Sequence, residues 1–247
     1  MEHHQTVTTV SKSMPDRAML GVRQVLSRGE TLYTEDDFAG DWFIVLSGVF
    51  RTCRYLPDGH RQVTGFFFPE DVFGLEAPTR RTSAEAVTEV VLMRYDRAFL
   101  DGDEEVSLPS LGHARHLLLG ALDAAEGRIE LLGLRSACER VAGFLLRMDS
   151  LMDADGYIFL PMGRADIADY LALTVETVSR TLSLLARRKL LSFRGPQRVL
   201  LVSRSQLEEL AGGRPWSSPA TILQQNIAYT AQRDGPGHLR TNHYISH

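Results

Sequence analysis

Short apolar runs separated by turn signals make up the chain from residue 22 to about residue 94. Residues 42–46 and 49–53 are two such runs, and Pro57-Asp58-Gly59 is typical of a turn between two further ones. Many short strands at close spacing predict a β-sandwich or a small barrel.

Near residue 108 the period of the apolar positions becomes that of a helix. Successive apolar residues are 7, 4, 3, 4 and 3 positions apart, a heptad stripe that predicts a long helix over residues 108–135. Such a stripe usually packs against a partner helix, so we expect a homodimer; the alternative is that it packs on the chain's own β-domain. The stripe consists of Leu111, Leu118, Leu122, Ala125, Ile129 and Leu132.

After a second helix over about residues 136–152, the pattern from residue 164 onward fits a helix-turn-helix. In this motif the second helix lies in the major groove of DNA. The turn falls on Ala172, where glycine is more usual because the turn requires a positive φ. Thr174 is expected to cap the second helix, which covers residues 175–187.

Three polar side chains, Glu176, Ser179 and Arg180, share one face of this second helix. An arginine can donate two hydrogen bonds to guanine, and a carboxylate can accept one from cytosine. The alternative is that Glu176 and Arg180, four residues apart, pair with each other. Because the helix lies in a helix-turn-helix with six basic residues downstream, we favour contact with bases.

The net charge of −4 argues by itself against a nucleic-acid partner, but the charge is unevenly distributed. Residues 174–204 hold seven basic side chains and one acidic one, a net charge of +6 that leaves −10 for the remainder. A basic island in an acidic chain indicates a local anion-binding surface, and a solvated helix face is the alternative.

Several classes of protein are disfavoured by composition and motifs. No apolar stretch approaches the ~18 residues of a membrane-spanning helix, and the N-terminus lacks the features of a secretory signal. Two cysteines, Cys53 and Cys138, make no disulfide framework, so we expect a cytoplasmic protein with reduced thiols. The chain has no nucleophile, phosphate-binding or metal-ligand motif of the common enzyme classes, so we do not expect an enzyme.

The run Leu-Thr-Val-Glu-Thr-Val-Ser-Arg at residues 173–180 resembles the recognition helix of the cyclic-AMP receptor protein/fumarate-nitrate reductase regulator (CRP/FNR) superfamily, especially its FixK-type branch. Residues 66–74, 83–86 and 132–140 extend the resemblance to roughly residues 22–212. It implies an α+β fold and a homodimeric transcription activator that contacts RNA polymerase, in nitrogen fixation and oxygen-limited metabolism. The implied parts are an N-terminal tail (1–21), a double-stranded β-helix of the cyclic-nucleotide-binding type, or β-roll (22–107), a dimerisation helix (108–135), a winged helix-turn-helix (136–212) and a disordered C-terminal tail (213–247).

The resemblance also assigns roles on DNA. Glu176 and Arg180 would recognise the G·C pair of a TTGA-type half-site, and Ser179 would contact neighbouring bases. Two-fold symmetry implies a palindrome with half-sites ~10–11 bp apart. The residues expected on the DNA backbone are Thr174, Thr177, Ser183, Arg187, Arg188, Lys189 and Arg164.

Neither family effector is expected here. An iron–sulfur cluster usually takes four cysteine ligands, and this chain has two distant ones. Members that bind cyclic AMP hold its ribose with a Gly-Glu pair and its phosphate with a following Arg-Ser/Thr pair; here Glu76 is displaced from Gly74, and the segment before Arg81 is short. Arg80 and Arg81 are therefore expected on the surface, with no cofactor and no metal.

Three alternatives stay open. The first is that the chain is a cyclic-nucleotide-responsive regulator of the same fold. The second is that it is a nucleotide-binding module that regulates another protein. The third is a redox switch at Cys138, for which an inert buried thiol is the favoured interpretation.

Overall fold

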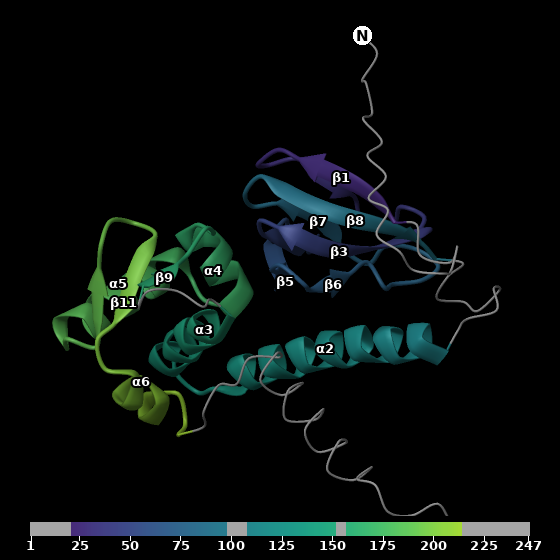
Figure 1. Cartoon of the computed structure of the whole chain (residues 1–247). Coiled ribbons are helices and arrows are strands. Elements are labelled where there is room, and N and C mark those ends of the chain that lie inside the picture. Colours follow the sequence, from purple (N-terminus) through teal and green to yellow (C-terminus); the bar gives the residue numbers. More distant parts are fainter. Residues whose placement is uncertain (1–20, 98–107, 152–156, 214–247) are drawn as a thin grey trace, which may run out of the picture.

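The computed structural model describes residues 21–97, 108–151 and 157–213, with residues 108–117 as backbone only. An N-terminal β-roll, a long helix and a C-terminal helical domain make up this part of the chain (Figure 1). The predicted α+β architecture is confirmed. Apart from Gly21 and Gly213, the two predicted tails lie outside the described residues.

The β-roll consists of two four-stranded antiparallel sheets, ordered β1-β8-β3-β6 and β2-β7-β4-β5. Its core is aromatic: the ring centroid of Phe73 lies 5.2 Å from that of Phe43, 5.1 Å from Phe50 and 5.0 Å from Phe67. Aromatic side chains from both sheets therefore form one shared core. The strands are β1 Val22–Leu26, β2 Thr31–Tyr33, β3 Asp41–Ser47, β4 Phe50–Tyr55, β5 Arg61–Phe67, β6 Val72–Phe73, β7 Ser83–Ala86 and β8 Val90–Asp96.

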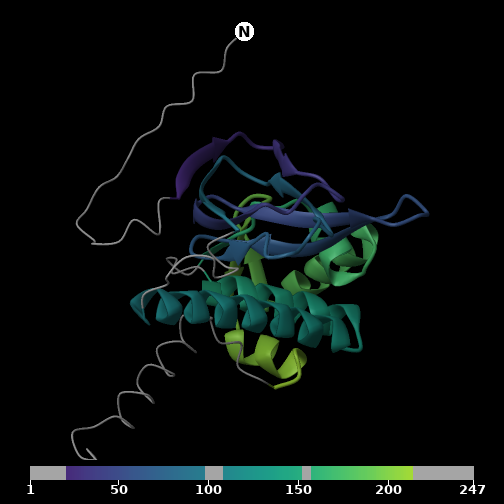
Figure 2. The ribbon, with the colours of Figure 1, turned by 90° about the vertical axis from the view of Figure 1, so that its right-hand side faces the viewer.

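Helix α2, Leu108–Gly133, runs along the roll and has two different faces (Figures 1 and 2). One face packs on the body of the protein: Leu131 is fully buried, and the guanidinium of Arg128 donates to the carbonyl oxygens of Val63 and Thr64 at 2.8 and 2.6 Å. These contacts fix the rotation of the helix about its axis.

The heptad stripe lies on the opposite face of α2. Leu118, Leu122 and Ile129 are 50%, 54% and 70% exposed, and Ala125 is exposed as well. Leu132 is half-buried, and the side chain of Leu111 lies outside the described residues. The alternative that the stripe packs on the chain's own β-domain is therefore wrong at Leu118, Leu122, Ala125 and Ile129, because other side chains of α2 make that contact.

The C-terminal domain combines four helices, α3 to α6, with a small sheet ordered β10-β11-β9. Its core is apolar and includes Phe144 of α3, Ile167 of α4, and Val178 and Leu182 of α5. Because α4 and α5 share this core, their side chains pack as one unit. The elements are α3 Ala137–Leu151, β9 Tyr157–Phe159, α4 Arg164–Leu171, α5 Val175–Arg187, β10 Leu191–Phe193, β11 Arg198–Leu201 and α6 Arg204–Leu210.

Candidate nucleic-acid interface

The turn between α4 and α5 has the geometry that the sequence predicted. Ala172 adopts the left-handed conformation, with φ 52° and ψ 50°, and its N–H donates to the carbonyl of Ala168. The next amide, that of Leu173, donates to the same carbonyl at 2.9 Å. A sharp reversal of the chain follows, and it sets the angle at which α5 leaves the turn.

Thr174 is the N-cap of α5, as predicted. Its hydroxyl oxygen accepts a hydrogen bond from the amide of Thr177 at 3.1 Å, and the two hydroxyl oxygens lie 2.9 Å apart. The capping bond satisfies one of the free amides of the first turn. The remaining amides and the helix dipole make this end of α5 attractive to an anion such as a DNA phosphate.

The polar face of α5 is open to solvent. Glu176, Ser179 and Arg180 are all exposed, whereas Val178, Leu182 and Leu185 on the other side are buried. Among the described residues neither Glu176 nor Arg180 makes an ion pair, so the alternative in which they pair with each other is not realised. The geometry leaves both side chains available to a ligand.

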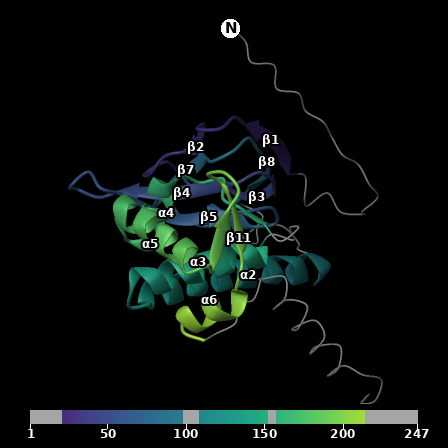
Figure 3. The same ribbon diagram turned by 90° about the vertical axis from the view of Figure 1, so that its left-hand side faces the viewer.

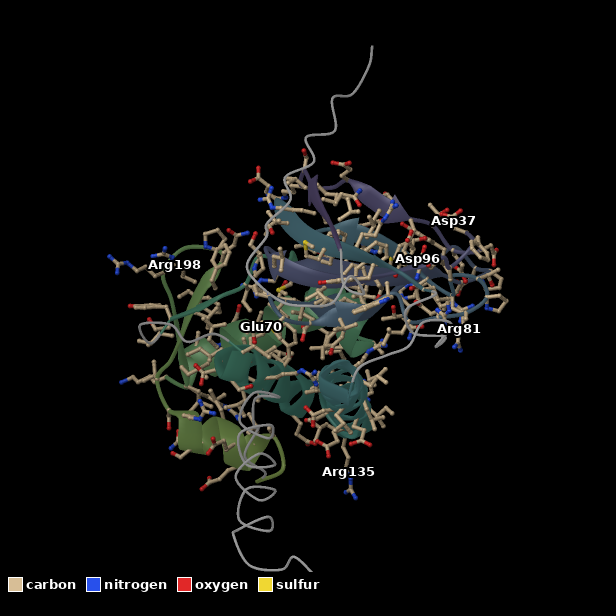
Figure 4. The ribbon with its side chains drawn as sticks, turned by 45° about the vertical axis from the view of Figure 1, so that its right-hand side comes forward. Asp37, Glu70, Arg81, Asp96, Arg135 and Arg198 are labelled. Carbon is tan, nitrogen blue, oxygen red and sulfur yellow. The ribbon has the colours of Figure 1, made fainter. Side chains whose placement is uncertain are left out.

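Five further basic side chains surround this face. Arg187, Arg188 and Lys189 are exposed at the C-terminal end of α5. Arg194 and Arg198 are exposed on the β10–β11 hairpin, and Figure 4 shows Arg198 pointing away from the molecule. The basic island is therefore a continuation of the recognition face rather than a set of scattered charges.

Arg164, which was expected to contact the DNA backbone, contacts an aromatic ring within the protein. Its guanidinium carbon lies 5.6 Å from the ring centroid of Phe193, and its Nη1 is buried without a hydrogen-bond partner in the described structure. Arg164 thus connects the start of α4 to the β10–β11 hairpin, and its Nη1 still has hydrogen bonds to donate.

Arg140 is a functional candidate that the sequence did not single out. Its guanidinium donates to the carbonyl of Leu134 at 3.0 Å and to the carbonyl of Leu171 at 3.3 Å. The first carbonyl follows the end of α2 and the second ends α4. Arg140 therefore connects the long helix to the turn of the helix-turn-helix, a contact between segments too distant in sequence to leave a local signal.

The expectation that Arg80 lies on the surface is wrong. Its side chain is 3% exposed, with the guanidinium carbon 4.3 Å from the ring centroid of Tyr33 and 5.4 Å from that of Phe43. The two terminal nitrogens donate to the carbonyls of Gly74 and Asp41 at 2.7 and 2.5 Å. Backbone acceptors and aromatic faces make burial of this cation tolerable.

Glu76 completes this buried polar group. One of its carboxylate oxygens lies 3.7 Å from Nη1 of Arg80, and the other accepts from the hydroxyl of Thr82 at 3.1 Å. Arg81, in contrast, is exposed at the outer end of the roll, as expected (Figure 4). The interior of the roll is thus occupied by the chain's own cation.

The two thiols are poorly suited to redox chemistry. Burial raises the pKa of Cys53 to about 11, and it also raises the pKa of the half-buried Cys138. The thiolate is the reactive form, so a raised pKa lowers reactivity at neutral pH.

The described residues contain neither a candidate membrane span nor a candidate metal site. No helix in the described ranges is long and apolar enough to cross a membrane. The same ranges hold no group of three or more His, Cys, Asp or Glu side chains that could bind a metal ion.

Two family models match this chain, one before α2 and into its flanking segment, the other after it. A family model for the cyclic nucleotide-binding domain matches residues 23–102, and one for the Crp-like helix-turn-helix domain matches residues 139–210. The nitrogen fixation regulation protein FixK of Azorhizobium caulinodans is 41% identical over 200 residues, which cover 78% of this chain and 80% of the relative. The transcriptional activatory protein AadR of Rhodopseudomonas palustris is 37% identical over 171 residues, which cover 66% of this chain and 70% of the relative.

A solved structure agrees with these matches. FixK2 from Bradyrhizobium japonicum superimposes with a TM-score of 0.72 at 37% sequence identity, over 78% of this chain and 98% of that one.

Proposed function

Because this chain belongs to the CRP/FNR superfamily of transcription regulators, on its FixK-type branch, we propose that it is a homodimeric activator that binds a TTGA-type palindrome without a diffusible cofactor. It acts as a DNA-binding regulator and not as an enzyme. In this proposal residues 22–107 form the β-roll domain, residues 108–135 form the dimerisation helix, and residues 136–212 bind DNA. RNA polymerase is the expected protein partner of the DNA-bound dimer.

The observation that carries this proposal is the solvent-exposed face of α5. Arg180 donates two hydrogen bonds to the guanine of each half-site, Glu176 accepts one from the cytosine, and Ser179 contacts neighbouring bases. Their exposure, and the absence of an ion pair between Glu176 and Arg180, support this role. Val175 stands where cyclic-AMP-type members carry a second base-contacting arginine, so this chain recognises a different half-site.

The phosphate contacts come from the residues that surround this face. Hydroxyls at the start of α5 and cations at its end lie along the path of a DNA backbone that passes the major groove. Such contacts position the protein and make its affinity depend on salt. The residues proposed are Thr174, Thr177, Ser183, Arg187, Arg188, Lys189 and Arg164. Thr174 also caps α5 by accepting a hydrogen bond from the amide of Thr177.

The partner in the homodimer is a second copy of α2. The exposed stripe that includes Leu118, Leu122 and Ile129 supports this assignment, because isolated apolar helix faces of this length are costly in water. Two copies related by a two-fold axis present two α5 helices to successive turns of the major groove, with half-sites ~10–11 bp apart.

The burial of Arg80 supports activity without cyclic nucleotide. The Gly74–Ser83 run is the segment that corresponds to the nucleotide contacts of effector-binding members, and Arg80 from this run fills the interior beside Tyr33. A nucleotide entering there would have to displace a cation already bonded to the chain's own carbonyls. An iron–sulfur cluster does not fit either, because Cys53 and Cys138 cannot supply four ligands. Cys138, whose pKa is raised, is assigned no redox role.

A gel shift tests the function. The protein is expected to bind a TTGA-N6-TCAA duplex at least about 1,000-fold more tightly than a scrambled duplex of the same composition. Arg187→Ala is the matched control for a phosphate contact: it is expected to weaken both duplexes similarly and to reduce the slope of log affinity against log salt by about 1. Equal binding of the two duplexes by the parent protein would contradict sequence-specific recognition.

Added cyclic AMP or cyclic GMP distinguishes the cofactor-free regulator from its effector-dependent alternative. Unchanged affinity is the expected result. A clear rise in affinity with either nucleotide would overturn the cofactor-free part of the proposal while leaving DNA binding intact.

A further inference from the structure

A network of four charged residues connects the β-roll to the helix-turn-helix. Nη1 of Arg51 on β4 lies 2.7 Å from Oδ1 of Asp166 on α4. Nη2 of Arg61 on β5 lies 2.6 Å from the same oxygen and 2.7 Å from Oδ2 of Asp169, which also accepts from Nε of Arg61 at 2.9 Å. We call these four residues the interdomain lock.

The lock joins segments that are far apart in the sequence and adjacent in space. Its partners are separated by 105 to 115 positions. Figure 3 shows α4 beside β5, and Figure 2 shows the hairpin of β4 and β5 alongside the green helices of the C-terminal domain. The lock is therefore the electrostatic part of an interface between domains, not a local surface pair.

The members of the lock are largely shielded from water. Their side chains are between 10% and 21% exposed, so salt screens them less than surface charges. An aromatic contact lies next to them: the rings of Phe66 on β5 and Tyr170 on α4 are 5.1 Å apart. Buried charges of this kind are costly unless paired, so the interface strongly favours the arrangement in which all four meet.

The same hairpin offers a contrast. Arg54 on β4 forms an ion pair with Glu35 at 3.1 Å, but this pair stays within the roll, and the Arg54 side chain is 51% exposed. An arginine on this hairpin therefore need not reach the other domain. Arg51 reaches Asp166 of α4 although it shares strand β4 with Arg54.

We propose that the interdomain lock sets the orientation of the recognition helix, with Arg61 and Asp169 as positioning residues for DNA binding. Because α4 and α5 share one core, holding α4 against β5 also fixes α5. In the locked arrangement the face with Glu176, Ser179 and Arg180 is open to solvent. Loss of the lock lets the helix-turn-helix sample other orientations, which reduces the fraction of molecules ready to bind DNA.

The lock also affects charge at the interface. Asp166 and Asp169 are acidic residues within the DNA-binding domain, and Arg61 of the roll pairs with both of them. Arg51 is shared between Asp166 and Glu85 of β7, whose Oε2 accepts from Nε and Nη2 of Arg51 at 3.0 and 2.5 Å. An unlocked domain would carry both carboxylates without these partners, which adds negative charge to the domain that approaches DNA. Both consequences act in the same direction, toward weaker DNA binding.

Asp169 and Arg61 are the residues to change. Asp166 is unsuitable because its second carboxylate oxygen accepts from the amide of Gly163 at 3.3 Å, in the capping box of α4. A substitution there would fray the helix as well as break the lock. The carboxylate of Asp169 serves Arg61 alone among the hydrogen bonds of the described residues.

A double-mutant cycle on DNA affinity tests the lock, a readout that rests on the proposed function. Arg61→Gln and Asp169→Asn are each expected to weaken binding to the palindrome about 10-fold, within the range of typical couplings between sites. The double variant is expected to bind about as well as Arg61→Gln alone, because among the described residues Asp169 contacts only Arg61 and its loss adds nothing once Arg61 is gone. Arg54→Gln, the matched control on the same hairpin, and Asp169→Glu, which keeps the carboxylate, are expected to bind like the parent.

A distance measurement without DNA tests the same idea independently. Spin labels carried by unnatural amino acids at the exposed positions Glu89 of the roll and Glu209 of α6 report the separation of the domains. The distribution is expected to broaden in Arg61→Gln and Asp169→Asn, and to stay narrow in the parent and in Arg54→Gln.

The outcomes separate the two proposals. If the parent binds DNA but the two variants keep its affinity and its distance distribution, or if their losses add, the lock has no positioning role. Tighter DNA binding by the variants would also overturn the inference, since it would mean that the lock holds back recognition. If the parent fails to bind the palindrome, the proposed function fails, and the distance distributions alone decide whether the lock holds the domains together.

Discussion

Replacing Ile129 by serine tests the role of the stripe on α2 most directly. Ile129 is 70% exposed in the single chain, so a second copy has most of its apolar side chain still to bury. Full burial of an isoleucine contributes about 1.5–3 kcal/mol, which leaves about 1–2 kcal/mol for the exposed part. A two-fold axis counts each residue twice, so the dimer loses about 2–4 kcal/mol, a weakening of its dissociation constant by about 30- to 700-fold.

Sedimentation equilibrium over a dilution series measures this constant. Val25→Ser is the matched control, because Val25 is 51% exposed but lies on β1, away from the stripe. The control is expected to leave the dissociation constant of the dimer unchanged. If Ile129→Ser also leaves it unchanged, then the stripe is not the dimer contact, and the argument from its exposure is refuted.

Three further predictions concern the turn, the recognition face and the roll. Arg180→Ala is expected to cost about 1–3 kcal/mol of DNA binding and to relax the preference at the G·C pair, which competition gel shifts with substituted duplexes would measure; equal losses on all duplexes would instead indicate a phosphate contact. Ala172→Gly is expected to raise the free energy of unfolding by about 0.5–1 kcal/mol, because an L-residue is strained at φ 52°, and a destabilised variant in urea titrations would contradict this. Burial raises the pKa of Asp71 to about 6, so the neutral acid is favoured in the folded state, and stability is expected to fall as pH rises from 4 through 6. Asp71→Asn is expected to remove this fall. The fall is at most about 3 kcal/mol, because each pKa unit corresponds to about 1.36 kcal/mol. Parallel curves of stability against pH for the two proteins would contradict this prediction.

Features that depend on neighbouring residues were predictable from the sequence. The left-handed turn at Ala172 and the cap at Thr174 depend on hydrogen bonds to residues three or four positions away, such as the amide of Thr177. The stripe on α2 follows from spacing alone. For these features the information lies within one or two helical turns.

Features that depend on distant partners were not predictable. In the run Thr79-Arg80-Arg81-Thr82 both arginines look like surface residues, but the partners that bury Arg80 come from residues 33, 41, 43 and 74. The interdomain lock has the same character, because Arg61 and Asp169 are 108 positions apart. Spacing also defines a stripe on α2 without saying what covers the opposite face, and the contacts of Arg128 and Leu131 answer that question.

The position of the basic island has a consequence for the rate of binding. Six of its seven cations lie on α5, just after it or on the adjacent hairpin, at the end of the molecule away from the roll (Figure 1), whereas Arg204 at the start of α6 pairs with Asp149 and Glu208. The sequence outside the island has a net charge of −10. Such a separation gives the protein a large electric dipole. As it comes within about one Debye length of DNA, ~8 Å at physiological ionic strength, the dipole turns the basic end toward the duplex before any contact forms. Most encounters then begin with the recognition helix already facing the groove, and added salt lowers the association rate constant by removing that orientation.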